Sequence, residues 1–370
     1  DSSVFIAYFL MALPAGYVMR KYGYKAGIIL GLLLFGGGCF LFLPAADTNN
    51  YIFFLGALFV VASGLTFLET AANPYATILG EPATATQRLN FAQAFNGLAV
   101  VIAPIIGGKF ILSGTEYSQQ QLNAMPSADL AVYLQSEANR VKTPYLILGI
   151  IILLIAVLFY FIKLPDSKES STDEAGSGFG KLFRIFHLRG SVVAQFFYVG
   201  AQVCVASFFI NVVKNAVGMN EKTASDYLSY GYGAAFFTGR FAGTFLMKYY
   251  APQKLLSLYA VINIALCALV IFATGMLTVY ALIGIAFFMS IMFPTIFALG
   301  IRGLNKTDTK MGSSLIIMSI VGGALLPPLL GVISDYTKNI QYGYVVPLIC
   351  FVVVAWYGLG GYKIKNTSAV

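Results

Sequence analysis

The chain has 370 residues, of which 58% are hydrophobic and only 10% are charged, whereas a soluble domain carries about 25% charged residues. This composition excludes a soluble enzyme or binding domain and indicates a protein that crosses a lipid bilayer several times. The net charge of +8 is typical of membrane proteins with Lys and Arg in their cytoplasmic loops, so we expect no nucleic-acid partner.

Apolar stretches of about 20 residues, long enough to span a bilayer, recur along nearly the whole chain. Because backbone amides must be hydrogen-bonded internally in lipid, these stretches must be helices, and the predicted fold class is all-α. Eleven spans are predicted, at residues 4–20, 26–45, 51–79, 90–113, 144–163, 190–213, 225–248, 254–273, 277–301, 312–334 and 342–362.

The central segment KLPDSKESSTDEAGSGFGKLFR is rich in Ser, Gly and both signs of charge, which is typical of a linker. We therefore expect an N-terminal half at residues 1–163, a cytoplasmic linker at 164–187 and a C-terminal half at 188–370.

The basic residues are unevenly distributed when the loops are assigned alternately to the two sides of the membrane. Most lie on one side, with Arg20, Lys21, Arg88, the linker and the C-terminal tail. The positive-inside rule makes this side cytoplasmic, so the C-terminus is predicted inside the cell. The long loop before the fifth predicted span lies outside, and its apolar positions at helical spacing predict a short surface helix.

Three landmarks of the first half recur in the second half at a nearly constant distance along the chain. The pairs are Gly16 and Gly243, Pro74 and Pro294, and Pro104 and Pro328. Such parallel repeats are found in transporters that bind their substrate between the two halves. The predicted span at 190–213 has no counterpart, so the repeat predicts a twelve-helix design whose first helix is missing from this chain.

Several segments carry a resemblance to known transporters. The loop GYVMRKYGYK, with Gly16 and Gly23, resembles the loop signature of the major facilitator superfamily, although Arg20 stands where that signature usually has an acid. The segments LETAANPY, RLNFAQAFN, FFYVGAQVCVASFFI and FMSIMFPTIFALGI resemble the L-fucose/proton symporter family and the related glucose/galactose transporters. The resemblance runs from about residue 4 to residue 360.

This resemblance implies a major facilitator fold of two six-helix halves in a bacterial inner membrane. It also implies transport of a small sugar, with a proton as the coupling ion, no other cofactor and no enzymatic activity. We expect a monomer in the lipid bilayer.

Of the 15 acidic residues, only Glu69, in FLETAANPYATILG, lies deep in a predicted span. A charged group at the bilayer centre costs roughly +2.5 to +3.5 kcal/mol on insertion scales, and intramembrane ionisable residues are functional by default. Burial favours the protonated form, so Glu69 is predicted to carry the coupling proton. The resemblance implies the same role. The alternative interpretation is a static ion pair with a buried base such as Arg240.

Polar side chains within the predicted spans of both halves are candidates for binding a sugar. Amides both donate and accept hydrogen bonds, which suits a ring of hydroxyl groups, although for each residue the alternative is a bridge between helices. The six candidates are Asn73, Gln93, Asn96, Tyr198, Gln202 and Asn211.

Arg240 is the one basic residue well inside a span, and we expect it to act in gating rather than in substrate contact. Glycine lets helices approach closely and proline frees backbone groups. Gating or structural roles are therefore predicted for Gly16, Gly23, Pro294 and Pro327. The single His and four Cys residues are not clustered, so no metal site is expected.

These observations predict proton-coupled uptake of L-fucose, or of a related hexose such as galactose or glucose, by alternating access. An uncoupled sugar facilitator and a membrane sugar sensor on a transporter scaffold are the alternatives.

Overall fold

The structure is a computed structural model that describes all residues except 1, 49, 111–116, 118, 165–178 and 365–370. Most of the expected linker and part of the expected external loop therefore lie outside the described residues. All elements of the described part are helical. Eight helical segments in it are long and apolar enough to cross a membrane, which agrees with the predicted all-α membrane fold.

The first half comprises α1 (Ser2–Thr48), α2 (Tyr51–Ile78), the 3-10 turn η1 (Pro82–Thr84), α3 (Ala85–Phe110), α4 (Gln119–Ala124) and α5 (Ser127–Phe161). Two helical segments make up α1, because Gly23 has non-helical torsion angles, φ 84° and ψ 174°. Glycine adopts positive φ without the steric penalty of a Cβ atom. The break lies between the predicted spans 4–20 and 26–45.

The second half begins with α6 (Phe179–Leu182), α7 (Phe186–Val217), α8 (Glu221–Asp226), the π-helical η2 (Tyr227–Gly233), α9 (Ala234–Leu246) and α10 (Pro252–Phe272). It continues with α11 (Met276–Met289), α12 (Met292–Ile301), α13 (Lys306–Met318), η3 (Ser319–Val321), α14 (Gly322–Thr337), η4 (Ile340–Tyr344), α15 (Val345–Trp356) and η5 (Tyr357–Gly361).

Several predicted spans differ from the observed helices in their length or continuity. The short surface helix expected in the external loop corresponds to α4, and the apolar positions from Ser127 onward belong to the 35-residue α5. The predicted span 277–301 is interrupted at Ser290 and Ile291, between α11 and α12. The predicted span 225–248 is divided by the π-helical turn η2.

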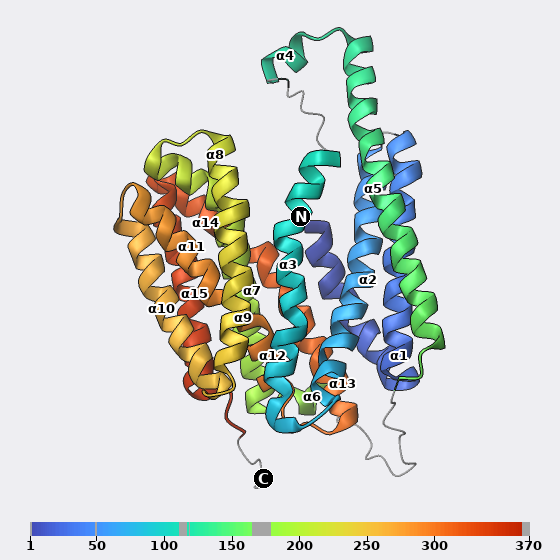
Figure 1. Ribbon diagram of the computed structural model, residues 1–370, viewed down its shortest axis with the longest axis vertical. Coiled ribbons are helices and arrows are strands. Elements are labelled where there is room, and N and C mark those ends of the chain that lie inside the picture. The colour runs from blue at the N-terminus through green and yellow to red at the C-terminus, as the bar shows by residue number, and fades with distance from the viewer. Residues whose placement is uncertain (1, 49, 111–116, 118, 165–178, 365–370) are drawn as a thin grey trace.

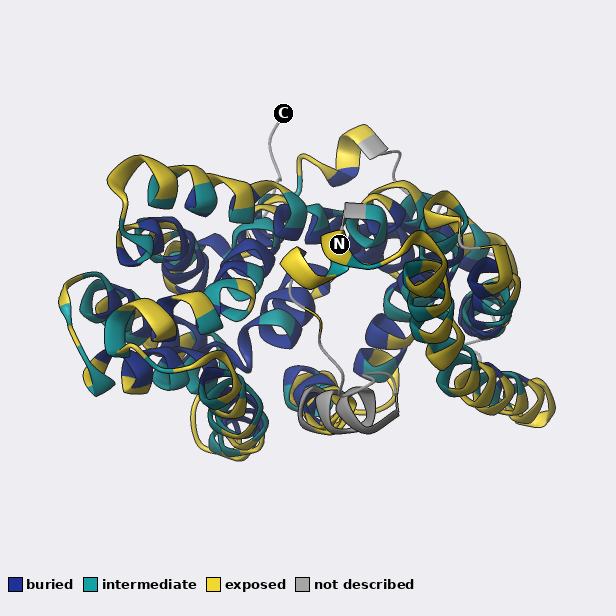
Figure 2. Ribbon diagram, turned by 90° about the horizontal axis from the view of Figure 1, so that it is seen from above, coloured by how far each residue is buried: buried dark blue, intermediate teal, exposed yellow. Residues whose placement is uncertain are grey.

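The helices form two groups, which Figure 1 shows side by side. In one group α1 packs against α2 and α5, and in the other α7 packs against α11, α12, α14 and α15. Between the groups, α3 contacts α9 and α12, while α13 contacts α1 and α2. Figure 2 shows the buried residues on the helix faces that turn toward other helices, with exposed residues on the outer faces.

The two groups meet closely at the end of the molecule that carries α6 and α13, opposite to α4 (Figure 1). Gly16 of α1 permits this approach. A Cβ atom at Gly16 would overlap the side chain of Ser314 and lie 3.4 Å from the Met311 sulfur, both in α13. The absence of a side chain at Gly16 therefore lets the two halves pack together below the pocket described next.

Candidate functional site

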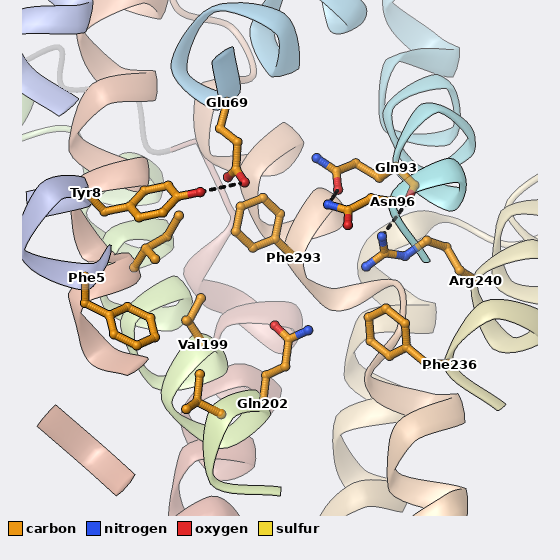
Figure 3. A pocket seen from close by; sticks show the side chains of 12 residues that line it. Phe5, Tyr8, Glu69, Gln93, Asn96, Val199, Gln202, Phe236, Arg240 and Phe293 are labelled. Atoms are coloured by element: carbon orange, nitrogen blue, oxygen red, sulfur yellow. Dashed lines mark hydrogen bonds between the residues drawn. The ribbon is translucent and has the colours of Figure 1, made fainter. Parts of the chain in front are cut away.

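A pocket of about 260 Å³ lies between the two groups of helices (Figure 3). One wall comes from α1, α2 and α3, and the other from α7, α9, α12 and η3. The lining residues are Phe5, Tyr8, Glu69, Gln93, Asn96, Val199, Gln202, Val203, Phe236, Arg240, Phe293 and Ile320. Both halves of the chain therefore contribute polar and apolar groups to one site.

Glu69 projects from α2 into this pocket, where Tyr8 of α1 approaches it (Figure 3). The Tyr8 hydroxyl donates a hydrogen bond to Glu69 Oε1 over 3.1 Å. The other carboxylate oxygen, Oε2, is buried and has no hydrogen-bond partner among the described residues. A buried polar atom without a partner is costly. One oxygen is thus held by the protein, and the other is free to take a proton.

Three side-chain amides, one from α2 and two from α3, are connected by hydrogen bonds next to the pocket. The Gln93 side-chain amide donates to Asn73 Oδ1 over 2.9 Å, and the Asn96 amide donates to Gln93 Oε1 over 3.4 Å. Gln93 and Asn96 line the pocket, whereas Asn73 is only 6% exposed and lies behind Gln93. Asn73 therefore orients Gln93 rather than facing the pocket itself.

Arg240 of α9 lies in the pocket wall and links α9 to α3 and to the turn between α11 and α12 (Figure 3). Its Nε donates to the Ser290 carbonyl over 2.7 Å and its Nη1 to the Gln93 carbonyl over 2.6 Å. The guanidinium carbon also lies 4.7 Å from the centre of the Phe236 ring, a favourable cation–π geometry. Among the described residues no ion pair joins Arg240 to Glu69, so the structure gives no support to a static pair.

Pro294 explains why the Ser290 carbonyl is available to Arg240. In a helix the N–H of residue 294 would bond to the carbonyl of residue 290, but proline has no N–H. Pro294 is buried near the start of α12, just after the interruption between α11 and α12. Proline in this position thus leaves one carbonyl for the Arg240 guanidinium.

The remaining pocket wall combines one amide with apolar side chains. Gln202 of α7 projects into the pocket, with Phe5, Phe236 and Phe293 around it (Figure 3). A few convergent polar groups set in an apolar lining are typical of small-molecule sites. The arrangement suits a ligand with hydroxyl groups on its edge and an apolar face.

Two predicted sugar-binding residues lie outside the pocket lining. Tyr198 is fully buried, and its hydroxyl donates to the Met289 carbonyl over 3.2 Å. Asn211 is exposed and lies nine residues after Gln202 on α7. The structure therefore brings together Glu69, Gln93, Asn96, Gln202 and Arg240, with Asn73 in support.

Sequence reasoning did not identify Tyr8 or the aromatic lining residues Phe5 and Phe293. A signal for Tyr8 was present, because it is the only polar side chain in the stretch VFIAYFLMALPAG. The described residues hold no group of three or more His, Cys, Asp or Glu side chains that could bind a metal ion. The expectation that the protein uses no metal or organic cofactor stays a prediction.

Residues 1–327 match the Major Facilitator Superfamily. The chain belongs to this superfamily. It is 43% identical over 361 residues to the L-fucose-proton symporter of Escherichia coli K12, covering 96% of this chain and 82% of that protein. It is 39% identical over 361 residues to the glucose/galactose transporter of Brucella abortus, covering 97% of this chain and 84% of that protein.

A solved structure in the superfamily has the same fold. The crystal structure described as the transporter FucP in the outward conformation superimposes with a TM-score of 0.89 at 42% identity, covering 97% of this chain and 88% of that chain. The resemblance to sugar symporters inferred from sequence segments is thereby confirmed. These relatives are transporters rather than enzymes.

Proposed function

We propose that the protein imports a hexose together with a proton, with L-fucose, galactose or glucose as the candidate sugars. The observation that carries this proposal is the position of Glu69, which shares one pocket between the two halves with Gln93, Asn96 and Gln202. The names of the relatives support both parts, since they include a fucose–proton symporter and a glucose/galactose transporter.

The pocket residues divide into a proton site and a sugar site. The proton binds Glu69 at its unpartnered oxygen Oε2, while Tyr8 holds Oε1. Removing the charge from the pocket favours the arrangement that binds the sugar, whose hydroxyl groups then bond to the amides of Asn96, Gln93 and Gln202. The apolar face of the sugar lies against the phenylalanine rings of the pocket.

We propose that the structure represents a conformation in which the pocket is open toward the α4 end. A second cavity of about 330 Å³ shares Phe5 and Val203 with the pocket and continues along α14 past Gly323, Pro327 and Gly331. Since α14 runs from the pocket toward the α4 end (Figure 1), this cavity provides a route for entry. Pro327, a predicted gating residue, lines that route.

The opposite end is held closed by polar contacts between the halves. Asn90 of α3 donates to Thr295 Oγ1 of α12 over 3.2 Å, and Gln87 of α3 donates to the Thr244 carbonyl over 3.1 Å. Arg240 adds its bond to Gln93. These contacts must break before the sugar and proton can leave. Arg240 therefore acts as a gating residue, and it also lines the transport pocket.

The proposed membrane arrangement has eleven spans in this chain. The segments of α1 on either side of Gly23 form two, and α3 and the η2–α9 segment add to the other long apolar helices. We propose a division into halves at 1–163 and 188–370 with a linker between, and a monomer in a bacterial inner membrane. The end with α6 faces the cytoplasm, with the C-terminus, because the basic loops lie there.

The sugar site is tested by equilibrium binding to the purified protein. We expect Asn96→Ala and Gln202→Ala each to weaken binding of L-fucose or galactose about tenfold, since each removes one hydrogen bond to a buried sugar. Asn211→Ala, on the same helix as Gln202 but outside the pocket, is the matched control. Unchanged affinity in both pocket variants would remove the amides from the sugar site.

A further inference from the structure

A second groove lies between the halves at the α6 end, apart from the transport pocket. It has a volume of about 370 Å³ and is formed by η1 and α3 on one side and by α9 on the other. Figure 1 shows α3 and α9 side by side, and they are in contact. The groove shares no lining residue with the transport pocket. Two of its lining residues, Gln87 and Thr244, form one of the contacts of the closed end, but the groove itself has no part in binding the sugar or the proton.

The groove changes from cationic to aromatic along its length. In α3, Arg88 precedes Phe91 by three residues, and after α9 Lys248 follows Phe245 by three and Phe241 by seven. Residues at these spacings share a helix face. Both helices therefore place a cation at the α6 end of the groove and phenylalanine deeper in the membrane.

Exposed tyrosines mark the level of the membrane surface next to Lys248. Tyr249 and Tyr250 are 70% and 57% exposed, and tyrosine is enriched where lipid headgroups meet the hydrocarbon core. The cationic end of the groove thus lies at headgroup level, and its phenylalanine rings lie at the level of the acyl chains.

Neither cation is neutralised by a carboxylate among the described residues. Arg88 donates to the carbonyls of Ala76, Thr77 and Glu81 and to the Thr84 hydroxyl, all of which are uncharged acceptors. The Lys248 ammonium lies 5.4 Å from the centre of the Phe245 ring, and the ion pairs of the described residues include neither side chain. Two cationic side chains therefore line the groove without a carboxylate partner among the described residues.

The aromatic part of the groove opens to the outside of the helix bundle. The Phe91 and Phe241 rings meet edge to face across the two halves, with centroids 6.3 Å apart. Phe91, Phe241 and Phe245 remain 51%, 37% and 54% exposed. The Gln87 side-chain amide donates to the Thr244 carbonyl and so joins α3 and α9 within the groove lining. The apolar walls are thus accessible to a lipid chain.

We propose that this groove binds one anionic phospholipid. Its phosphate lies at Lys248 and Arg88, and one acyl chain lies along Phe91, Phe241 and Phe245. Basic pockets between transmembrane helices on the cytoplasmic side recognise such headgroups, and a free phosphate ion would use none of the aromatic surface. Because each half supplies one wall, the bound lipid holds α3 and α9 together at the closed end.

The experiment is native mass spectrometry of the purified protein with phosphatidylglycerol and phosphatidylcholine that carry the same acyl chains. We expect the parent protein to retain phosphatidylglycerol in preference to phosphatidylcholine. Lys248→Gln should weaken phosphatidylglycerol binding about fivefold, as expected for one basic residue near a lipid surface, and leave phosphatidylcholine unchanged. The control is Lys254→Gln, an exposed lysine in the first turn of α10, which should behave like the parent.

A second pair of variants tests the acyl-chain part. Phe241→Ala should weaken the binding of both lipids, whereas Phe272→Ala, at the 80% exposed end of α10, should weaken neither. Equal retention of the two lipids by the parent, or equal behaviour of Lys248→Gln and Lys254→Gln, would overturn the proposal. Full displacement of phosphatidylglycerol by equimolar glycerol phosphate would show a site for free anions and would also overturn it.

Discussion

At the scale of single residues, the two charged groups of the pocket have different kinds of partner. Arg240 is fixed by two backbone carbonyls from different segments, one of which Pro294 leaves available. Within the described part of the chain, Glu69 Oε1 accepts a hydrogen bond from Tyr8 and Oε2 has no partner. The guanidinium is therefore held in place as part of the wall, and the carboxylate is the group that can change its protonation state.

Tyr8→Phe tests whether this hydrogen bond positions the coupling carboxylate. A hydrogen bond to a charged group contributes about 1.5–3 kcal/mol, so we expect proton-driven sugar accumulation in proteoliposomes to fall about tenfold or more. Sugar binding should change much less, because Tyr8 holds the carboxylate and the amides are unchanged. Tyr17→Phe, in the same helix and 61% exposed, is the control. Normal accumulation by Tyr8→Phe would show that Glu69 needs no positioning by Tyr8.

The sequence predicted the chemistry of the site better than the direction of each side chain. Glu69 was identifiable because a carboxylate within an apolar span is rare, and Gln93, Asn96 and Gln202 because amides stand out there. Tyr198 lies one turn before Gln202, but its side chain is fully buried. Its hydroxyl bonds to the Met289 carbonyl at the end of α11, and its ring lies 6.4 Å from the Phe293 ring of α12. Helical spacing predicts which residues share a helix face, but it does not predict which of them reaches the pocket.

At the scale of helices, the all-α membrane fold was predictable from hydropathy, whereas the interruptions within predicted spans were not. The break at Gly23 follows a recognisable loop sequence, GYVMRKYGYK. The break between α11 and α12 depends on contacts distant in the sequence, since Arg240 of α9 takes up the Ser290 carbonyl. The π-helical turn at Tyr227–Gly233 likewise lies in a stretch that hydropathy alone represents as one continuous span.

A mutation in the contact between α3 and α12 can weaken the packing of the two halves at the closed end. Asn90 and Thr295 are fully buried, and the Asn90 amide bonds Thr295 Oγ1. We expect Asn90→Ala to shift the protein toward the state open at the α6 end by about 1 kcal/mol, roughly fivefold in population. Thr295 keeps its bond to the Ile291 carbonyl, so the protein should still fold.

Electron–electron distance measurements between spin labels at Arg20 and Lys254 would report this shift. Both positions are exposed at the α6 end, one in each half, and the four native cysteines are buried. The control is Ser257→Ala, whose hydroxyl bonds within α10. Identical distance distributions for Asn90→Ala and the control would show that this contact does not hold the gate.

At the scale of the whole molecule, function follows from the placement of one pocket between two groups of helices. The α1–α13 and α3–α12 contacts close one end, and the cavity along α14 leads toward the other. A carrier that opens its two ends in turn can move a sugar against its gradient only if a proton moves with it in every cycle. The central claim is that Glu69 carries this proton.

Glu69→Gln in proteoliposomes tests that claim most directly. Glutamine imitates the protonated acid in shape and hydrogen bonding, so the variant can reorient with sugar bound but cannot load and release a proton. We predict that it exchanges labelled for unlabelled sugar across the membrane at a rate similar to that of the parent, while a proton gradient no longer drives accumulation. Accumulation at the parent's level with the parent's pH dependence would contradict the account.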